Sequence, residues 1–132
     1  MSFTKFTVAT RGQTEFINIT SQIRSFVESE NTKNGLCHVY VPHTTAGVTI
    51  NEAADPDVEK DILRELNKIV PFTDNYAHME GNSAAHIKAT IVGSGVTIPI
   101  ADGNLKLGTW QGVFFCEFDG SRNRSVYITI LD

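Results

Sequence analysis

The sequence predicts an α+β domain in which extended segments at both ends of the chain enclose two helices. Three observations indicate this class: the N-terminal segment alternates polar and apolar side chains, a helical apolar spacing begins after Asp55, and the last third consists of short β-rich runs separated by turn residues. A chain of 132 residues without repeats or linkers has the size of one domain. We therefore expect a single compact domain over residues 1–132, built mostly of antiparallel β-sandwich-like sheets with two helices.

The first third of the chain is expected to form strands around one short helix. Phe3–Ala9 and Glu15–Ile19 read as strands from their alternation, and Thr20–Ser29 reads as a short helix because its apolar residues recur three and four positions apart. Leu36–Val41 is rich in β-branched and aromatic residues, which favours a buried strand. Pro42 ends this strand, since proline has no N–H to donate to a sheet.

The middle of the chain contains the two principal helices. The first follows Asp55, whose carboxylate can cap the first turn, and carries Pro56 where a missing N–H costs nothing. Its apolar residues line one face, and Pro71 follows its end; they are Val58, Ile62, Leu63, Leu66 and Ile69. After a polar loop, Ser83–Val92 is expected to form the second helix, with Ser83 as its cap.

The C-terminal third has the pattern of an antiparallel meander, in which short apolar runs alternate with the turns Asp102-Gly103-Asn104 and Asp119-Gly120. The expected strands are Val96–Ile100, Leu105–Leu107, Trp110–Phe118 and Ser125–Leu131.

Composition and charge argue against nucleic acid and membranes as partners of this protein. The net charge of −4 is spread along the chain without a basic stripe, which argues against a nucleic-acid surface. The N-terminus lacks the apolar core of a signal peptide, and no run approaches the roughly 20 apolar residues of a membrane helix. Cys37 and Cys116 lie in apolar runs and are expected to be reduced core thiols. We expect a cytoplasmic protein with neither nucleic acid nor membrane as partner.

The candidate functional residues are polar groups placed at the ends of predicted elements, where a scaffold can present them. They are His43, Thr44, Thr45, Asn51, Glu52, His78, Glu80, Asn82, His86, Gln111, Glu117, Arg122 and Arg124. The first five fall between the strand that ends at Pro42 and the helix that follows Asp55.

These residue types are compatible with two kinds of chemistry. His43, His78 and His86 could ligate a divalent metal ion such as zinc or magnesium, although their spacing matches no compact zinc signature. Alternatively, a histidine beside Glu52 or Glu80 could move protons for a phosphate or pyrophosphate ester. Arg122 and Arg124 carry the fork-shaped donors that phosphate oxygens accept, so a phosphorylated ligand or another anion is an expected partner. Residues alone leave both chemistries open.

Three long segments, in this order, closely resemble the motifs of the YjbQ-like family: "PHTTAGVTINE", "HMEGNSAAHIKA" and "VTIPIADGNLKLGTWQGVFFCEFDG". Some of its members are labelled secondary thiamine-phosphate synthase. The resemblance covers nearly the whole chain. It implies a compact α+β fold, a homotrimer, and a polar pocket that receives side chains from the first two motifs: His43, Glu52, His78, Asn82 and His86.

Carried over residue by residue, the resemblance points to positions in all three motifs: His43, Thr44, Thr45, Asn51, Glu52, His78, Gly81, Asn82, His86, Lys88, Gln111, Glu117 and Arg122. Of these we expect His43, Glu52 and His86 to be catalytic, and we expect the ligand to be bound by Thr44, Thr45, Asn51, Asn82, Lys88, Gln111 and Arg122. The expected function is therefore a small homotrimeric protein that binds an anionic, phosphorylated ligand, with secondary thiamine-phosphate synthase activity. The alternatives are a metal-binding hydrolase with His43, His78 and His86 as ligands, and a non-catalytic trimeric binding module.

Overall fold

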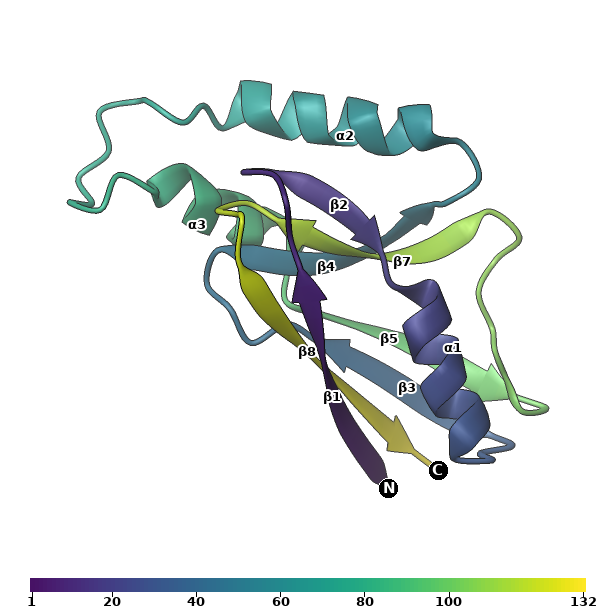
Figure 1. Cartoon of the computed structure of the whole chain (residues 1–132). Helices are drawn as coiled ribbons and strands as arrows, with labels where there is room; N and C mark the ends of the chain where they lie inside the picture. The colour runs from purple at the N-terminus through teal and green to yellow at the C-terminus, as the bar shows by residue number, and fades with distance from the viewer.

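Two stacked antiparallel sheets form the frame of the molecule, and two helices cover the outer face of the smaller sheet (Figure 1). The structure is a computed structural model and describes residues 1–132. Its elements, in chain order, are β1 (Ser2–Ala9), β2 (Glu15–Asn18), α1 (Thr20–Ser29), β3 (Gly35–Tyr40), β4 (Ala46–Glu52), α2 (Pro56–Ile69), α3 (Ser83–Val92), β5 (Gly95–Ala101), β6 (Asn104–Leu105), β7 (Gln111–Glu117) and β8 (Asn123–Leu131).

The strands divide into a five-stranded sheet with the order β1-β8-β3-β5-β6 and a three-stranded sheet with the order β2-β7-β4. All of their pairings are antiparallel, which confirms the expected α+β class with antiparallel sheets. The two termini lie side by side, because β1 pairs with β8 along its whole length and the amino group of Met1 contacts Asp132 at 3.2 Å. The fold has three helices rather than two, since α1 also packs Ile23 and Val27 into the core.

Strand β7 lies in the middle of the smaller sheet, with both of its faces covered. This position explains why its sequence is apolar at consecutive residues. Val113 and Phe115 pack in the main core between the two sheets. Phe114, Cys116 and Phe118 point the other way and pack in a smaller cluster with residues of α2 and α3. Both faces of the smaller sheet are therefore covered, one by the larger sheet and the other by helices. None of the helices combines the length and apolarity needed to cross a membrane.

Strand β4 was not identified from the sequence, and it determines where the candidate residues lie. Ala46–Glu52 pairs with β7 along its full length, from Ala46 opposite Glu117 to Glu52 opposite Gln111. Ala46 and Val48 belong to the main core and Ile50 packs against it, so every second residue of the segment faces the core, as in a strand. No strand was predicted here from the sequence. His43 therefore lies before one end of a strand and Glu52 at its other end.

Gly47 allows the end of α3 to lie directly against β4. A Cβ atom at position 47 would stand 2.5 Å from the carbonyl oxygen of Gly93, which also accepts a hydrogen bond from the Val48 N–H at 3.1 Å. Because that neighbour is backbone, a side chain at position 47 could be accommodated only by moving α3 away. The position of α3 against the start of β4 therefore depends on the close contact between Gly47 and Gly93.

The helix ends follow the predicted signals only in part. Asp55 caps α2 as expected, accepting a hydrogen bond from the Asp57 N–H at 2.9 Å, and Pro56 opens the helix. Asn82 rather than Ser83 occupies the cap position of α3, and its side chain makes no capping hydrogen bond. The amide of Asn82 is instead directed toward Asp119, at 3.0 Å.

Candidate functional site

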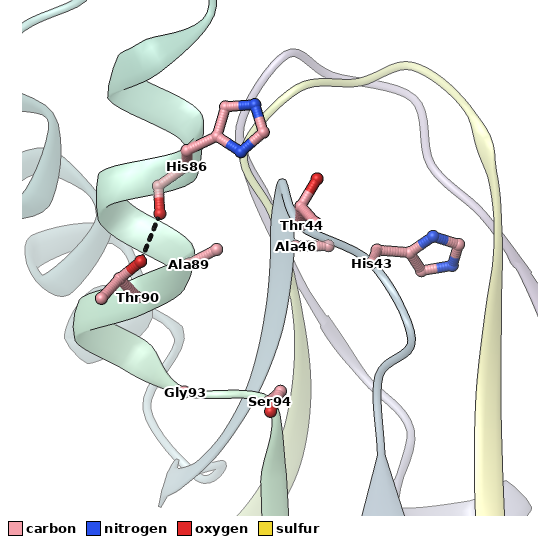
Figure 2. A pocket seen from close by; sticks show the side chains of 8 residues that line it. All are labelled: His43, Thr44, Ala46, His86, Ala89, Thr90, Gly93 and Ser94. Atoms are coloured by element: carbon pink, nitrogen blue, oxygen red, sulfur yellow. Dashed lines mark hydrogen bonds between the residues drawn. The ribbon is translucent and has the colours of Figure 1, made fainter.

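A polar pocket of about 440 Å³ lies where the start of β4, the beginning of α3 and the turn between β7 and β8 meet. None of its lining residues is hydrophobic; they are Pro42, His43, Thr44, Thr45, His78, Glu80, Asn82, His86, Asp119, Arg122 and Arg124. A second hollow of about 400 Å³ continues from it between α3 and the start of β4 (Figure 2). The two hollows share His43, Thr44 and His86.

The floor of the pocket is a buried ion pair that connects the two sheets. Arg124 of β8 donates from Nε to Oε1 of Glu117 at 2.8 Å, and from Nη2 to Oε2 of Glu117 and to Oγ1 of Thr45, the latter at 2.9 Å. Glu117 also accepts from the Thr10 hydroxyl at 2.7 Å and from the Asp119 N–H at 3.0 Å. Arg124 is 5% exposed and Glu117 is not exposed at all, so each charge depends on the other and on these donors.

The hydrogen bonds set the charge state of the pair. Burial by itself would raise the pKa of Glu117, but hydrogen bonds from Arg124, the Asp119 N–H and Thr10 outweigh it, and the pKa lies below its ordinary value. Glu117 is therefore a carboxylate at neutral pH, and Arg124 is held in one orientation by two parallel hydrogen bonds.

One nitrogen of Arg124 remains available to a ligand. Nη1 makes no hydrogen bond with the protein, whereas Nε and Nη2 are both engaged. Nη1 is not among the fully buried polar atoms without a partner, which belong to Asn67, Asn82 and Lys88, so it retains some exposure, and Arg124 is one of the residues that line the pocket. The floor of the pocket thus presents the N–H donors of a fixed guanidinium.

His43 also lines the polar pocket, and its hydrogen bond with the backbone of Ser125 determines which ring nitrogen carries the proton. The backbone N–H of Ser125 donates to Nε2 of His43 at 2.9 Å, so Nε2 carries the lone pair and the neutral ring carries its proton on Nδ1. Figure 2 shows the ring turned toward β8 and away from His86. Burial, followed by the charge of Arg124, lowers the pKa of His43 below its ordinary value. His43 is therefore a neutral hydrogen-bond donor at physiological pH.

We expect NMR spectra of the folded protein with ¹⁵N-labelled histidine to show His43 as the Nδ1–H tautomer, titrating below its ordinary pKa of about 6.5. Because the folded state disfavours the protonated ring, the contribution of His43 to stability is present above pH about 6.5 and is lost as the pH falls below it. An Nε2–H tautomer, or a midpoint above 6.5, would contradict the hydrogen bond from Ser125 and the influence of Arg124.

His78 and His86 stand on the opposite side of the pocket. His86 projects from α3 and is half-buried, whereas His78 lies in the exposed loop before it. Their rings meet edge to face with centroids 5.5 Å apart, and neither ring makes a hydrogen bond with the protein. Their nitrogens are free to contact a bound molecule.

The three histidines line one pocket but do not form a three-ligand metal site within one chain. No group of three or more His, Cys, Asp or Glu side chains is placed to hold a metal ion. His43 is unsuited as a ligand, because Nε2 is occupied by the Ser125 N–H and Nδ1 carries the proton. The residues therefore do not fit the zinc or magnesium site expected from His43, His78 and His86.

Arg122 lies at the rim of the pocket and is already paired. It donates from Nε to the Asp119 carbonyl at 2.8 Å and from Nη2 to the Asp119 carboxylate at 3.0 Å. Its side chain is 55% exposed, so it is a solvated arginine with a carboxylate beside it. Of the two arginines, Arg124 is the more buried and the more firmly held in one orientation.

Comparisons with known proteins agree with this architecture. The sequence profile of the family described as "UPF0047 protein YjbQ-like" matches residues 4–132. The chain belongs to the UPF0047 (YjbQ-like) family. The UPF0047 protein MJ1081 of Methanocaldococcus jannaschii is 49% identical over 96% of this chain and 92% of its own, and the UPF0047 protein YugU of Bacillus subtilis is 46% identical over 94% and 95%.

Solved structures of the family share the fold. A crystal structure of an uncharacterised YjbQ/UPF0047 protein from Clostridium acetobutylicum has a TM-score of 0.95 at 48% identity and covers 97% of this chain and 99% of its own. A hypothetical protein from Aeropyrum pernix has a TM-score of 0.95 at 36% identity, with 99% and 98% covered. The expected family and its α+β fold are confirmed.

Four of the residues assigned through the family motifs lie outside the pocket, and three of them, Asn51, Glu52 and Gln111, lie at the far end of β4 and at its partner in β7. Glu52 pairs with Gln111 at the end of β4 that is remote from His43, and Asn51 precedes it on the same strand. The six residue steps from Ala46 to Glu52 span roughly 20 Å of extended chain. Gln111 uses its side-chain oxygen locally, accepting from the Gly108 N–H at 2.8 Å. Within one chain, the structure does not bring Glu52 to His43 and His86.

Lys88 is also turned away from the pocket. It lies at the centre of the buried face of α3, between Ala84, Ala85 and Ala89, and is 0% exposed. Its Nζ has no hydrogen-bond partner and stands 3.9 Å from the centre of the Phe72 ring. Burial lowers the pKa of Lys88. The ammonium group is therefore part of the contact between α3 and the loop after α2, and it does not line the polar pocket.

Sequence reasoning placed Glu117 and Arg124 among the candidates but assigned the ligand to Arg122. The alternation of inward-facing and outward-facing residues along β7 and β8 shows that Arg124 and Glu117 are buried. Arg124 continues the inward-facing series of Val126, Ile128 and Ile130 in β8, and Glu117 continues that of Val113 and Phe115 in β7. Opposite charges at inward positions of two facing strands indicate a buried ion pair.

Proposed function

We propose that the polar pocket binds a small phosphorylated molecule through Arg124. The observation that carries this proposal is the free Nη1 of a guanidinium that is 5% exposed and fixed by Glu117. Holding the group in place reduces the entropy lost on binding, and partial burial strengthens its hydrogen bonds to an anion. The Nδ1–H of neutral His43 supplies a further donor. A volume of about 440 Å³ lies in the range of small-molecule sites.

For the reaction, we propose the secondary thiamine-phosphate synthase activity that the family resemblance implies. In that reaction the nitrogen of a thiazole phosphate attacks the methylene carbon of hydroxymethylpyrimidine pyrophosphate, the C–O bond breaks, and pyrophosphate leaves with the bonding electron pair. Negative charge grows on the departing oxygens, and donors fixed in advance stabilise it. Arg124 and His43 are suited to this task, with His78 and His86 beside them. The homotrimer is likewise a proposal from the resemblance.

The two alternatives have less support. A metal-binding hydrolase needs converging ligands, and the histidines, carboxylates and thiols of one chain form no such group. A non-catalytic trimeric module needs no free donors, yet Arg124, His78 and His86 have nitrogens without protein partners. Metal content that is stoichiometric in the purified protein and lost in His86→Ala would favour the hydrolase.

The proposal is tested by calorimetric titration with methyl phosphate, pyrophosphate and acetate at physiological salt, beside an assay for thiamine-phosphate formation. We expect the phosphate ligands to bind and acetate not to bind, because the pocket donors match a multiply charged oxyanion. If methyl phosphate and pyrophosphate fail to bind at millimolar concentration, the proposed site is wrong. If they bind without product formation, the anion site stands and the synthase reaction is rejected.

A further inference from the structure

An apolar hollow of about 460 Å³ adjoins the polar pocket on the side of the loop before α3. Its lining residues are Tyr76, Ala77, His78, Ser83, His86 and Ile87. Tyr76 is held by a hydrogen bond from its hydroxyl to the Pro71 carbonyl at 2.5 Å, so its polar end is satisfied. Ile87 remains 39% exposed. The chain thus leaves fixed apolar surface uncovered at this point.

The hollow is continuous with the polar pocket through two side chains. His78 and His86 line both, and His86 also lines the hollow beside β4. Their rings meet edge to face and border both the polar pocket and the apolar hollow. A molecule that binds in the polar pocket and reaches these two rings therefore also meets the apolar surface.

We propose that this hollow is a specificity subsite for a flat, apolar ring in the phosphorylated ligand. The proposal rests on the proposed phosphate site, and it names the class of ligand as aryl or heteroaryl phosphates in preference to alkyl phosphates. The aromatic rings of Tyr76, His78 and His86 offer stacking and edge contacts to a planar group. Ile87 offers an aliphatic surface, and removal of apolar area from water supplies the gain in affinity.

The subsite is tested by calorimetry with two probes that share a phosphate group, phenyl phosphate and methyl phosphate. The wild-type protein is expected to bind phenyl phosphate about tenfold more tightly, since part of the ring leaves water. Ile87→Ser is expected to reduce this ratio toward one and to leave the affinity for methyl phosphate unchanged. Ile91→Ser is the matched control, because Ile91 lies four residues on along α3, is 56% exposed and does not line the hollow.

Each outcome separates the subsite from the phosphate site. Equal affinity of the wild type for the two probes overturns the subsite and leaves the phosphate site standing, whereas failure of both probes to bind overturns the phosphate site and the subsite with it. A change in oligomer mass of Ile87→Ser by native mass spectrometry, with Ile91→Ser unchanged, would assign the hollow to a contact between copies of the chain and also overturn the subsite. Loss of the ratio in Ile87→Ser alone, at unchanged mass, supports it.

Discussion

Replacing Arg124 with glutamine will weaken the binding of methyl phosphate by about 100-fold and lower the free energy of unfolding by about 3–5 kcal/mol. The affinity falls because the ligand loses charge-assisted hydrogen bonds from Nη1. The stability falls because the carboxylate of Glu117 is fully buried and loses the positive charge of Arg124 that compensates it. Calorimetric titration and denaturant unfolding measure the two effects.

Arg122→Gln is the matched control, since it removes the same charge from the rim. Its exposed pair with Asp119 contributes about 0–1 kcal/mol, and the affinity for methyl phosphate should change much less than in Arg124→Gln. If Arg122→Gln abolished binding and Arg124→Gln did not, the ligand would be bound at the rim, as first expected from the sequence.

A double variant separates binding from folding. Glu117→Leu with Arg124→Met replaces the buried ion pair by apolar side chains, an exchange that is often neutral for stability. We expect this variant to fold and to lack affinity for methyl phosphate. It should also resist acid better, because the lowered pKa of Glu117 gives stability that is present above pH about 4.3 and lost as the pH falls through its folded value. A double variant that binds phosphate normally would contradict the role of Arg124.

Replacing Lys88 with methionine is expected to raise the free energy of unfolding by about 1–3 kcal/mol and to leave phosphate affinity unchanged. Lys88 has an ammonium group with no exposure and no hydrogen bond, and methionine fills similar space without a charge. The lost contact with Phe72 offsets part of the gain.

Lys60→Met is the control for this change, because Lys60 lies on the exposed face of α2 with a side chain that is 74% exposed. Its effect on stability should stay within about 0.5 kcal/mol. If Lys88→Met instead weakened phosphate binding at unchanged stability, Lys88 would act on the ligand, as the resemblance implied.

The parts of the fold that the sequence predicted are those with a single strong local signal. Helix α2 has a capping aspartate, Pro56 and a one-sided apolar stripe, and the structure confirms it between Pro56 and Ile69. Strand β4 has a weaker signal, because its short alternation of Ala46, Val48 and Ile50 lies between polar residues on both sides. Without β4, Glu52 appeared close to His43.

The candidate site was predicted in outline, and the roles within it required the tertiary structure. The pocket does receive His43, His78, Asn82 and His86 from segments far apart in the sequence. Lys88 entered the ligand-binding set through the family motif, and the sequence of α3, with small or apolar side chains nearly all round, does not show which face is buried. The free nitrogen of Arg124 depends on contacts between two sheets, which no local pattern contains.

A crystal structure of the protein with phenyl phosphate shows whether the phosphate group of the ligand binds Arg124. We expect a phosphate oxygen about 2.7–2.9 Å from Nη1 of Arg124, within the pocket that His43 and His86 line. A phosphate group bound elsewhere, on Arg122 at the rim or at the remote end of β4 beside Glu52, with Nη1 left without a partner, would contradict it.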